Sequence, residues 1–156
     1  MKEMIKNLIF DLGNVLIEWN SEKILTSFEP EKERRQLLRQ VIFESGVWHQ
    51  TDKGELSLKE ACDEVLVQLD DSYHPAVQNI FYNWYEVVEV YSGLQEQIGL
   101  WADQGYRIYI LSTTCEIFYR IEKAGLLPIF PLLSGYILSS EVGVVKPEPE
   151  IYQKLL

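Results

Sequence analysis

Basic residues, paired cysteines and long apolar runs are all scarce in this sequence of 156 residues. Lysine and arginine together number 14 against 24 aspartates and glutamates, which gives a formal net charge of −10. This balance argues against nucleic acid or an anionic membrane as a partner, because both bind to a basic surface. It leaves room for a small phosphorylated ligand, whose site needs only local positive charge or a metal ion.

The two cysteines, Cys62 and Cys115, lie far apart and form no Cys-x-x-Cys pair. No secretory leader pattern precedes the first apolar segment, and no apolar run reaches membrane-spanning length. We therefore expect a reduced, cytoplasmic protein. The sequence has no internal repeats or low-complexity linkers, and its hydrophobic content of 47% predicts a packed core with room for a small appendage.

The chain is organised around a short apolar run, Leu8-Ile9-Phe10, that ends on Asp11 and is followed by Gly13-Asn14. The run predicts a buried strand, and Gly13-Asn14 permits a sharp turn or a positive φ directly after the acid. Ligands of open parallel sheets bind outside the carboxyl ends of the strands, so Asp11 is a candidate site residue. The alternative is a carboxylate that only caps a turn.

The rest of the pattern alternates between helices and strands. Ser57 and Glu60 have the spacing of a capping box, and so do Thr113 and Glu116. The apolar periodicity predicts helices over 21–28, 31–43, 57–69, 75–90, 94–104, 113–124 and 150–156, strands over 6–10, 106–111 and 135–138, and loops over 46–54 and 142–147. This order predicts an α/β fold, in which a helical insertion of residues 18–88 interrupts a parallel-sheet core of residues 1–17 and 89–156.

Four residues at strand ends or in loops have a coherent chemistry. A carboxylate such as Asp11 can attack phosphorus and form an aspartyl-phosphate that water later hydrolyses. The hydroxyl groups of Ser112 and Thr113, at a predicted helix start, can hold phosphate oxygens, although Thr113 could also be only a cap. Lys146 can offset the negative charge that nucleophile and phosphate share.

Three segments in this order resemble the motifs of the haloacid dehalogenase superfamily: Phe10 to Val15, Ile110 to Thr114, and Val144 to Tyr152. The resemblance implies a Rossmann-like sheet core, with Asp11 as nucleophile, Ser112 on the phosphate, and Lys146 as the motif lysine. It also implies Mg²⁺ as cofactor, bound by the Asp11 carboxylate and the Gly13 carbonyl.

The helices between the first two motifs resemble the small helical cap of this superfamily's first subclass. Trp48-His49-Gln50 and Gly54-Glu55-Leu56-Ser57 are similar to cap sequences of sugar-phosphate phosphatases of the glucose 1-phosphate type. The resemblance therefore implies a phosphatase that acts on a small phosphorylated metabolite, possibly a sugar phosphate.

The sequence departs from the family pattern in two places. Most phosphatases of the superfamily carry an acid/base aspartate two residues after the nucleophile, where this chain has Gly13; such a group contributes about 10²–10⁴-fold in rate. A fourth motif, an acidic pair that completes the Mg²⁺ site, would follow beyond Leu156. We therefore expect an incomplete Mg²⁺ site, a core incomplete at its C-terminal side, and weak activity of this chain alone.

Other interpretations stay open. A 2-haloacid dehalogenase on the same fold also lacks the second aspartate and needs no metal, and a truncated, non-catalytic remnant or binding module would keep only the fold. Cys115 and Arg120 resemble a cysteine-phosphatase loop, but with one residue too few between them. His49 is more readily explained as packed or solvated than as a substrate ligand.

The predicted topology leaves one side of the first strand uncovered. The strands that would cover Leu8, Ile9 and Phe10 come from sequence beyond Leu156 in this superfamily. Unpaired apolar strand edges promote association, so we expect the chain to self-associate through this edge.

Overall fold

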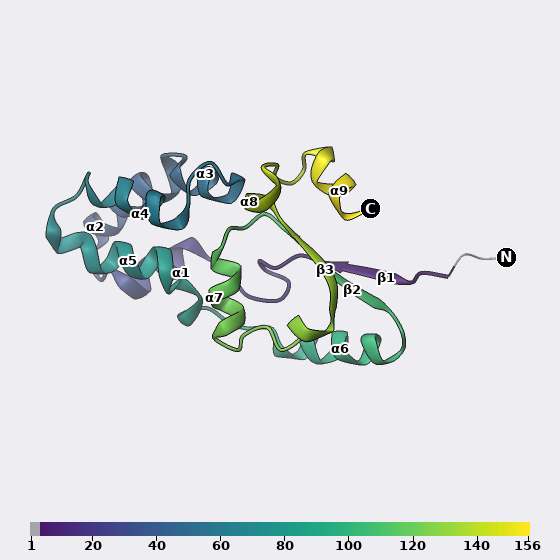
Figure 1. Ribbon diagram of the computed structural model, residues 1–156. Helices are drawn as coiled ribbons and strands as arrows, with labels where there is room; N and C mark the ends of the chain where they lie inside the picture. Colours follow the sequence, from purple (N-terminus) through teal and green to yellow (C-terminus); the bar gives the residue numbers. More distant parts are fainter. Residues whose placement is uncertain (1–3) are drawn as a thin grey trace.

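The computed structural model describes residues 4–156, in which a parallel sheet lies at one end of the molecule and a group of helices at the other (Figure 1). The strands are β1 (Asn7–Phe10), β2 (Arg107–Ser112) and β3 (Leu133–Leu138). They pair in the order β1-β2-β3, with Asn7 opposite Arg107 and Phe10 opposite Ile110. Both pairings between these strands are parallel, so the carboxyl ends of the strands meet at one edge, next to the helical end.

The helical end, which we call the cap lobe, consists of the helices between β1 and residue 86. They are α1 (Ser21–Phe28), α2 (Lys32–Leu38), a π-helical turn (Arg39–Glu44), α3 (Val47–Lys53), α4 (Leu58–Leu66), a 3₁₀ turn (Asp71–Tyr73), α5 (His74–Tyr82) and a second 3₁₀ turn (Trp84–Glu86). The Ser57–Glu60 capping box forms as predicted and begins α4.

Helices also flank the sheet, and the sequence predicted all of them except the one-turn helix that follows β3. They are α6 (Ser92–Asp103), α7 (Ile117–Lys123), the one-turn helix α8 (Ser139–Val142) and α9 (Pro149–Leu155), with a 3₁₀ turn (Phe130–Leu132) before β3. Helix α6 packs against β2, and α9 packs against β3. None of the helices in residues 4–156 has both the length and the apolar character that a membrane crossing requires.

The two chain segments that join sheet and cap lobe lie side by side. The Glu18 N–H donates to the Glu89 carbonyl at 2.8 Å, and the Tyr91 N–H donates to the Leu16 carbonyl at 3.0 Å. These bonds hold the entry and the exit of the insertion together. They fall where the sequence predicted the boundaries between residues 1–17, 18–88 and 89–156, a division that stays a prediction.

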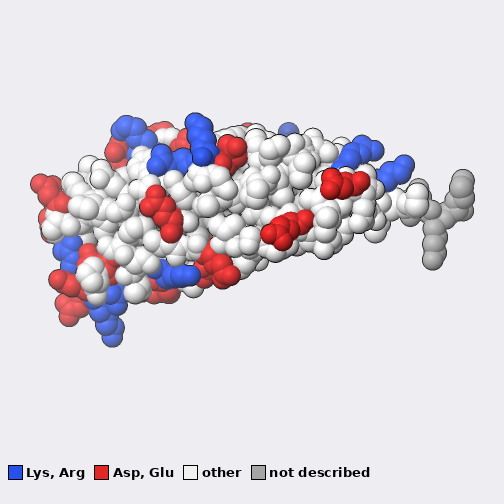
Figure 2. Space-filling model, turned by 90° about the horizontal axis from the view of Figure 1, so that it is seen from below, with Lys and Arg blue, Asp and Glu red and all other residues white. Residues whose placement is uncertain are grey.

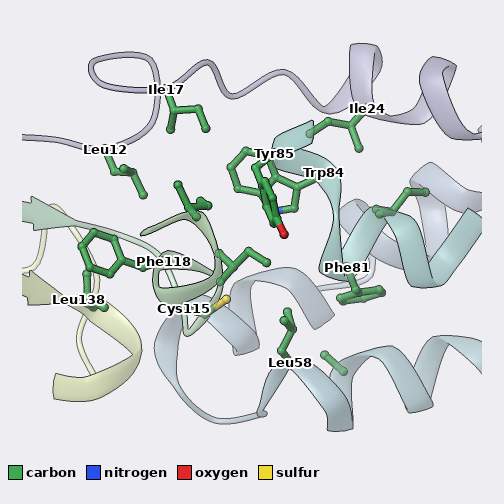
Figure 3. Close-up of a cluster of buried hydrophobic side chains, with 14 of the residues drawn as sticks. Leu12, Ile17, Ile24, Leu58, Phe81, Trp84, Tyr85, Cys115, Phe118 and Leu138 are labelled. Carbon is green, nitrogen blue, oxygen red and sulfur yellow. The ribbon is translucent and has the colours of Figure 1, made fainter. Parts of the chain in front are cut away.

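One apolar cluster runs from the sheet into the cap lobe (Figure 3). Figure 3 shows Leu138 and Phe118 at the sheet end, Tyr85 and Trp84 in the middle, and Phe81 toward the cap helices. Burying each such side chain contributes roughly 1.5–3 kcal/mol to the free energy of unfolding. The shared core therefore fixes the cap lobe against the strand ends.

The predicted loop at 46–54 is wrong, because these residues form helix α3. Gly46 and Gly54 are left-handed residues with φ of 93° and 80°, and they flank the helix rather than a turn. Inside it, Val47 and Thr51 lie one helical turn apart and are both buried. Packing of this face against the core outweighs the turn signals of the two glycines.

Several other boundaries also differ. The helix predicted over 31–43 changes to a π-helical turn at Arg39, and the one predicted to reach residue 90 ends at Tyr82. The predicted Thr113–Glu116 capping box is wrong: α7 begins only at Ile117, and the Glu116 carboxylate accepts from the Leu58 N–H at 2.6 Å instead. The predicted loop at 142–147 begins with the last residue of α8.

Strand β1 is an edge strand within residues 4–156, where it pairs only with β2. Its Ile9 side chain is 50% exposed. We expect Ile9→Lys to reduce self-association, because a charge on an edge strand opposes pairing with a second copy. Light scattering over a range of protein concentrations should show the mass of the unmodified chain rising and that of the variant staying at the monomer value.

Val67 is the matched control for this experiment, since it is an apolar residue of the cap lobe that is 84% exposed. We expect Val67→Lys to associate like the unmodified chain. An unmodified chain that stays monomeric at every concentration would contradict the edge prediction.

Candidate active site

The structure brings the predicted site residues together at the carboxyl ends of β1 and β2. Asp11 follows β1 directly, Ser112 is the last residue of β2, and Thr113 comes next. Lys146 lies in the loop between α8 and α9. All four line one cavity of about 430 Å³ between the sheet and the cap lobe.

The Asp11 carboxylate is held at both oxygens. The Leu12 N–H donates to Oδ1 at 2.7 Å, and the Lys146 ammonium contacts Oδ2 at 2.8 Å. The Asp11 side chain is nevertheless 41% exposed. It is therefore oriented by its neighbours and still accessible from the cavity.

Lys146 connects the second strand end to this carboxylate. Its Nζ also donates to the Leu111 carbonyl at 3.1 Å, and its backbone N–H donates to Thr113 Oγ1 at 3.1 Å. The Thr113 hydroxyl therefore fixes the Lys146 loop instead of capping α7. These contacts hold the ammonium group between β1 and β2.

The turn after Asp11 contains a residue with positive φ, as predicted for Gly13-Asn14; this residue is Asn14, with a φ of 58°. The Asn14 side-chain oxygen accepts from the Trp19 N–H at 2.9 Å, which stabilises the turn. A Cβ added at Gly13 would meet the Trp19 Cβ at 3.5 Å, an ordinary contact. Neither the backbone conformation nor the space for a Cβ therefore requires glycine at position 13.

The cap lobe contributes cavity residues that the sequence analysis missed. Trp19, Trp48 and Trp84 form an aromatic wall, with Trp19 and Trp48 stacked at a centroid distance of 5.2 Å. Asp52 lines the same cavity from the last turn of α3. Burial raises the pKa of Asp52 from its ordinary value of 3.8 to about 7. In sequence, Asp52 belongs to a predicted loop between two segments that are similar to family caps, and nothing else in the local pattern indicates a site residue.

Two other sequence candidates lie outside this chemistry. His49 is exposed and does not line the cavity. Burial raises the pKa of the Cys115 thiol to about 12, so this cysteine stays protonated. Arg120 donates to the Tyr82 carbonyl and the Asn83 side chain. Cys115 and Arg120 therefore do not form the nucleophile and anion-binding pair of a cysteine phosphatase.

The donor atoms of the described residues do not complete a Mg²⁺ site. Within residues 4–156, no three His, Cys, Asp or Glu side chains come together as a metal-binding group. The Asp11 carboxylate and the Gly13 carbonyl would give Mg²⁺ two oxygen ligands, but the ion prefers a near-octahedral shell. The assignment of Asp11 and Gly13 as metal ligands stays a prediction.

The end of α3 lies very close to α8 on the sheet side of the cavity. A Cβ at Gly54 would be 2.1 Å from the Ser140 carbonyl oxygen, whereas one at Gly46 would meet nothing within 4 Å. Both glycines have positive φ, for which an alanine costs roughly 1–2 kcal/mol. We expect Gly54→Ala to lower the free energy of unfolding by about 3 kcal/mol or more, because the clash adds to the backbone cost.

Gly46→Ala is the matched control and should cost only about 1 kcal/mol. Urea unfolding of the two variants measures the difference. Equal losses in both would show that the close approach of α3 to α8 is not rigid.

The sequence model of the haloacid dehalogenase-like hydrolase family matches residues 5–156. The chain belongs to this family. This haloacid dehalogenase-like hydrolase also shares its fold with solved enzymes of the family. A haloacid dehalogenase family enzyme from Bacteroides thetaiotaomicron, crystallised with magnesium and inorganic phosphate, is similar at 25% identity over 97% of this chain and 77% of that chain, with a TM-score of 0.72.

Two further structures are similar in fold. A predicted hydrolase of the same family from Porphyromonas gingivalis is 21% identical over 98% of this chain and 75% of its own, with a TM-score of 0.72. The L-2-haloacid dehalogenase of Xanthobacter autotrophicus, with chloropropionic acid covalently bound, is 17% identical over 97% of this chain and 64% of its own, with a TM-score of 0.58. The hydrolase thus has the α/β fold that phosphate-binding and dehalogenating relatives share.

Proposed function

We propose that this hydrolase is a phosphatase that cleaves a small phosphorylated metabolite through an aspartyl-phosphate on Asp11. The observation that carries the proposal is the Asp11–Lys146 pair at 2.8 Å, with the carboxylate still exposed to a cavity that Ser112 and Thr113 also line. A nucleophile for phosphorus needs an accessible oxygen and a nearby cation, because two negative groups must approach each other.

The roles follow from the positions of the four residues. Asp11 attacks phosphorus, and Lys146 offsets the charge that accumulates on the carboxylate and the phosphoryl oxygens. Ser112 and Thr113 provide hydroxyl groups at the end of β2, where they can hold the phosphate. Water then hydrolyses the aspartyl-phosphate and regenerates the Asp11 carboxylate.

The cavity supports a small substrate, such as a sugar phosphate. Its volume of about 430 Å³ suits a metabolite rather than a polymer, and its tryptophan wall offers an apolar face to the carbon skeleton. Figure 2 shows Lys and Arg interspersed with Asp and Glu on the face drawn there, rather than gathered into one basic patch. This distribution and the net charge favour neither nucleic acid nor a membrane as partner, and the two free cysteines suit the cytoplasm.

The proposal includes Mg²⁺ as cofactor because the similar enzyme from Bacteroides thetaiotaomicron was crystallised with magnesium and inorganic phosphate. Because residues 4–156 do not complete a site for the ion, the steps above depend only on the side chains of this chain. Binding of Mg²⁺ by this chain is expected to be weak.

The second candidate is a 2-haloacid dehalogenase, in which Asp11 would attack carbon and displace chloride. Gly13 favours it, because a halide leaves without a proton and needs no acid at that position. The fold of the Xanthobacter autotrophicus enzyme, with its covalently bound chloropropionic acid, is compatible with it. The hydroxyl groups beside Lys146 favour the phosphatase.

Two product assays separate the candidates. We expect inorganic phosphate to be released from a panel of sugar and alkyl phosphates, and no chloride from 2-chloropropionate. Chloride without phosphate would establish the dehalogenase. Release of neither product would favour the non-catalytic binding module.

A further inference from the structure

A phosphatase built on Asp11 needs a second group that handles protons. An alcohol leaves phosphorus poorly as an alkoxide, and a general acid contributes about 10²–10⁴-fold to such a step. Gly13 has no side chain to do this. Among the titratable side chains that line the cavity, Asp11 is the nucleophile, Lys146 is paired with it, and the Cys115 thiol has a pKa of about 12.

Asp52 is the remaining titratable group in the cavity. It lines the same cavity as Asp11 and Thr113, but it comes from the cap lobe rather than from the strand ends. Its side chain is half-buried, and within residues 4–156 no ion pair engages its carboxylate. A carboxyl group in this position is free to contact a bound ester.

The end of α3 is fixed to the loop that holds the phosphate-binding hydroxyls. The buried Ser139 hydroxyl accepts from the Thr114 N–H at 2.9 Å, and it donates to the Asp52 carbonyl. Gly54, two residues on, lies against the Ser140 backbone. Asp52 is therefore held in register with the strand ends by its own backbone, which a proton donor requires.

Burial, and not the neighbouring charges, sets the pKa of Asp52. In the cavity it shares space with Asp11, Lys146 and Cys115. The elements packed against α3 carry further charged or titratable groups: Arg39 and Glu44 on the π-helical turn, Lys59, Glu60, Cys62, Asp63 and Glu64 on α4, and Glu141 on α8. None of these shifts the Asp52 carboxyl group; burial alone raises its pKa to about 7, where both protonation states are accessible near neutral pH.

We propose that Asp52 is the general acid and base of this hydrolase, in the role that no side chain at position 13 can take. The proposal rests on the proposed phosphatase function. In this proposal the cap lobe encloses the substrate, and its Asp52 also transfers the proton at the leaving-group oxygen.

The reaction then proceeds in two steps. In the first, an Asp11 oxygen bonds to phosphorus, the bond between phosphorus and the ester oxygen breaks, and the Asp52 carboxyl proton goes to that oxygen, releasing the alcohol. In the second, water attacks phosphorus and gives a proton to the Asp52 carboxylate, while the bond from phosphorus to Asp11 breaks. Phosphate leaves, and Asp11 and Asp52 return to their starting states.

The leaving group of the substrate tests this role. We expect Asp52→Asn to lower kcat/KM for an alkyl phosphate by about 100-fold or more. The same variant should lower kcat/KM for p-nitrophenyl phosphate less than tenfold, because p-nitrophenolate leaves without a proton. Asp63→Asn is the matched control, since Asp63 is an exposed carboxylate on α4, and it should change neither substrate's rate.

A measurement on the unmodified chain keeps the proposal testable if Asp52→Asn fails to fold. The acid form of Asp52 is needed for the first step, so kcat/KM for the alkyl phosphate should fall as pH rises through about 7. The fall should be absent with p-nitrophenyl phosphate. Asp52→Glu should retain the fall with alkyl phosphate, since it keeps a carboxyl group.

Equal losses for both substrates in Asp52→Asn, or no loss for either, would overturn the role of Asp52 and leave the phosphatase standing. Identical pH profiles for both substrates in the unmodified chain would do the same. A chain that hydrolyses no phosphate ester would instead overturn the proposed function, and the role of Asp52 with it.

Discussion

Replacing Asp11 with asparagine should lower kcat for phosphate release by at least about 10³-fold. The amide of asparagine has the shape of the carboxylate but no negative oxygen to attack phosphorus. Its neighbours should stay in place, because the Leu12 N–H can still donate to the amide oxygen at the Oδ1 position. The effect should therefore fall on kcat rather than on folding.

Two controls separate chemistry from stability. The ion pair that the variant loses is partly exposed, so it should change the free energy of unfolding by no more than about 1 kcal/mol. Asp71→Asn removes a fully exposed carboxylate of the cap lobe and should leave kcat unchanged. Near-full turnover by Asp11→Asn would show that the nucleophile is another group.

Replacing Lys146 with alanine has the second largest expected effect. We expect a loss of about 2–4 kcal/mol of transition-state stabilisation, which lowers kcat/KM by about 30- to 1000-fold. The loss arises because the ammonium group lies 2.8 Å from Asp11 Oδ2 and is held there by the Leu111 carbonyl. Without it, the carboxylate and the phosphoryl oxygens repel each other with no cation between them.

Steady-state measurements should compare kcat/KM of Lys146→Ala with kcat/KM of the control variant Lys154→Ala. Lys154 lies on α9, is exposed and does not line the cavity, so its loss should leave kcat/KM unchanged. Lys146→Arg keeps the charge but not the shape of the ammonium group and should recover part of the activity. An unchanged kcat/KM in Lys146→Ala would leave Lys146 as a solvated loop residue.

The sequence was sufficient for the sheet and for the residues at its carboxyl edge. Asp11 and Ser112 end apolar runs whose local pattern specifies strands, and parallel strands bring their ends together. Lys146 could be assigned because its motif resembles that of the family. The contact of its ammonium group with Asp11 depends on the path of the loop after α8, which no local pattern specifies.

The cap side of the cavity could not be predicted for the same reason. Gly46 and Gly54 are turn formers in sequence, and only the packing of Val47 and Thr51 against the core makes the residues between them a helix. Asp52 lies on that helix, and its place in the cavity lining depends on this packing, which no local sequence pattern specifies. The position of Thr113 in sequence suggests a helix cap, but its hydroxyl accepts a hydrogen bond from the backbone N–H of Lys146, which is distant in sequence.

The proposed reaction passes through a covalent phosphoryl group on Asp11. Acid quenching during turnover of an alkyl phosphate, followed by digestion and mass spectrometry, measures it directly. We predict one added phosphoryl group on the peptide that contains Asp11, lost on longer incubation without substrate and absent from Asp11→Asn. Phosphate release with an unmodified Asp11 peptide at every quench time would show that Asp11 is not the nucleophile.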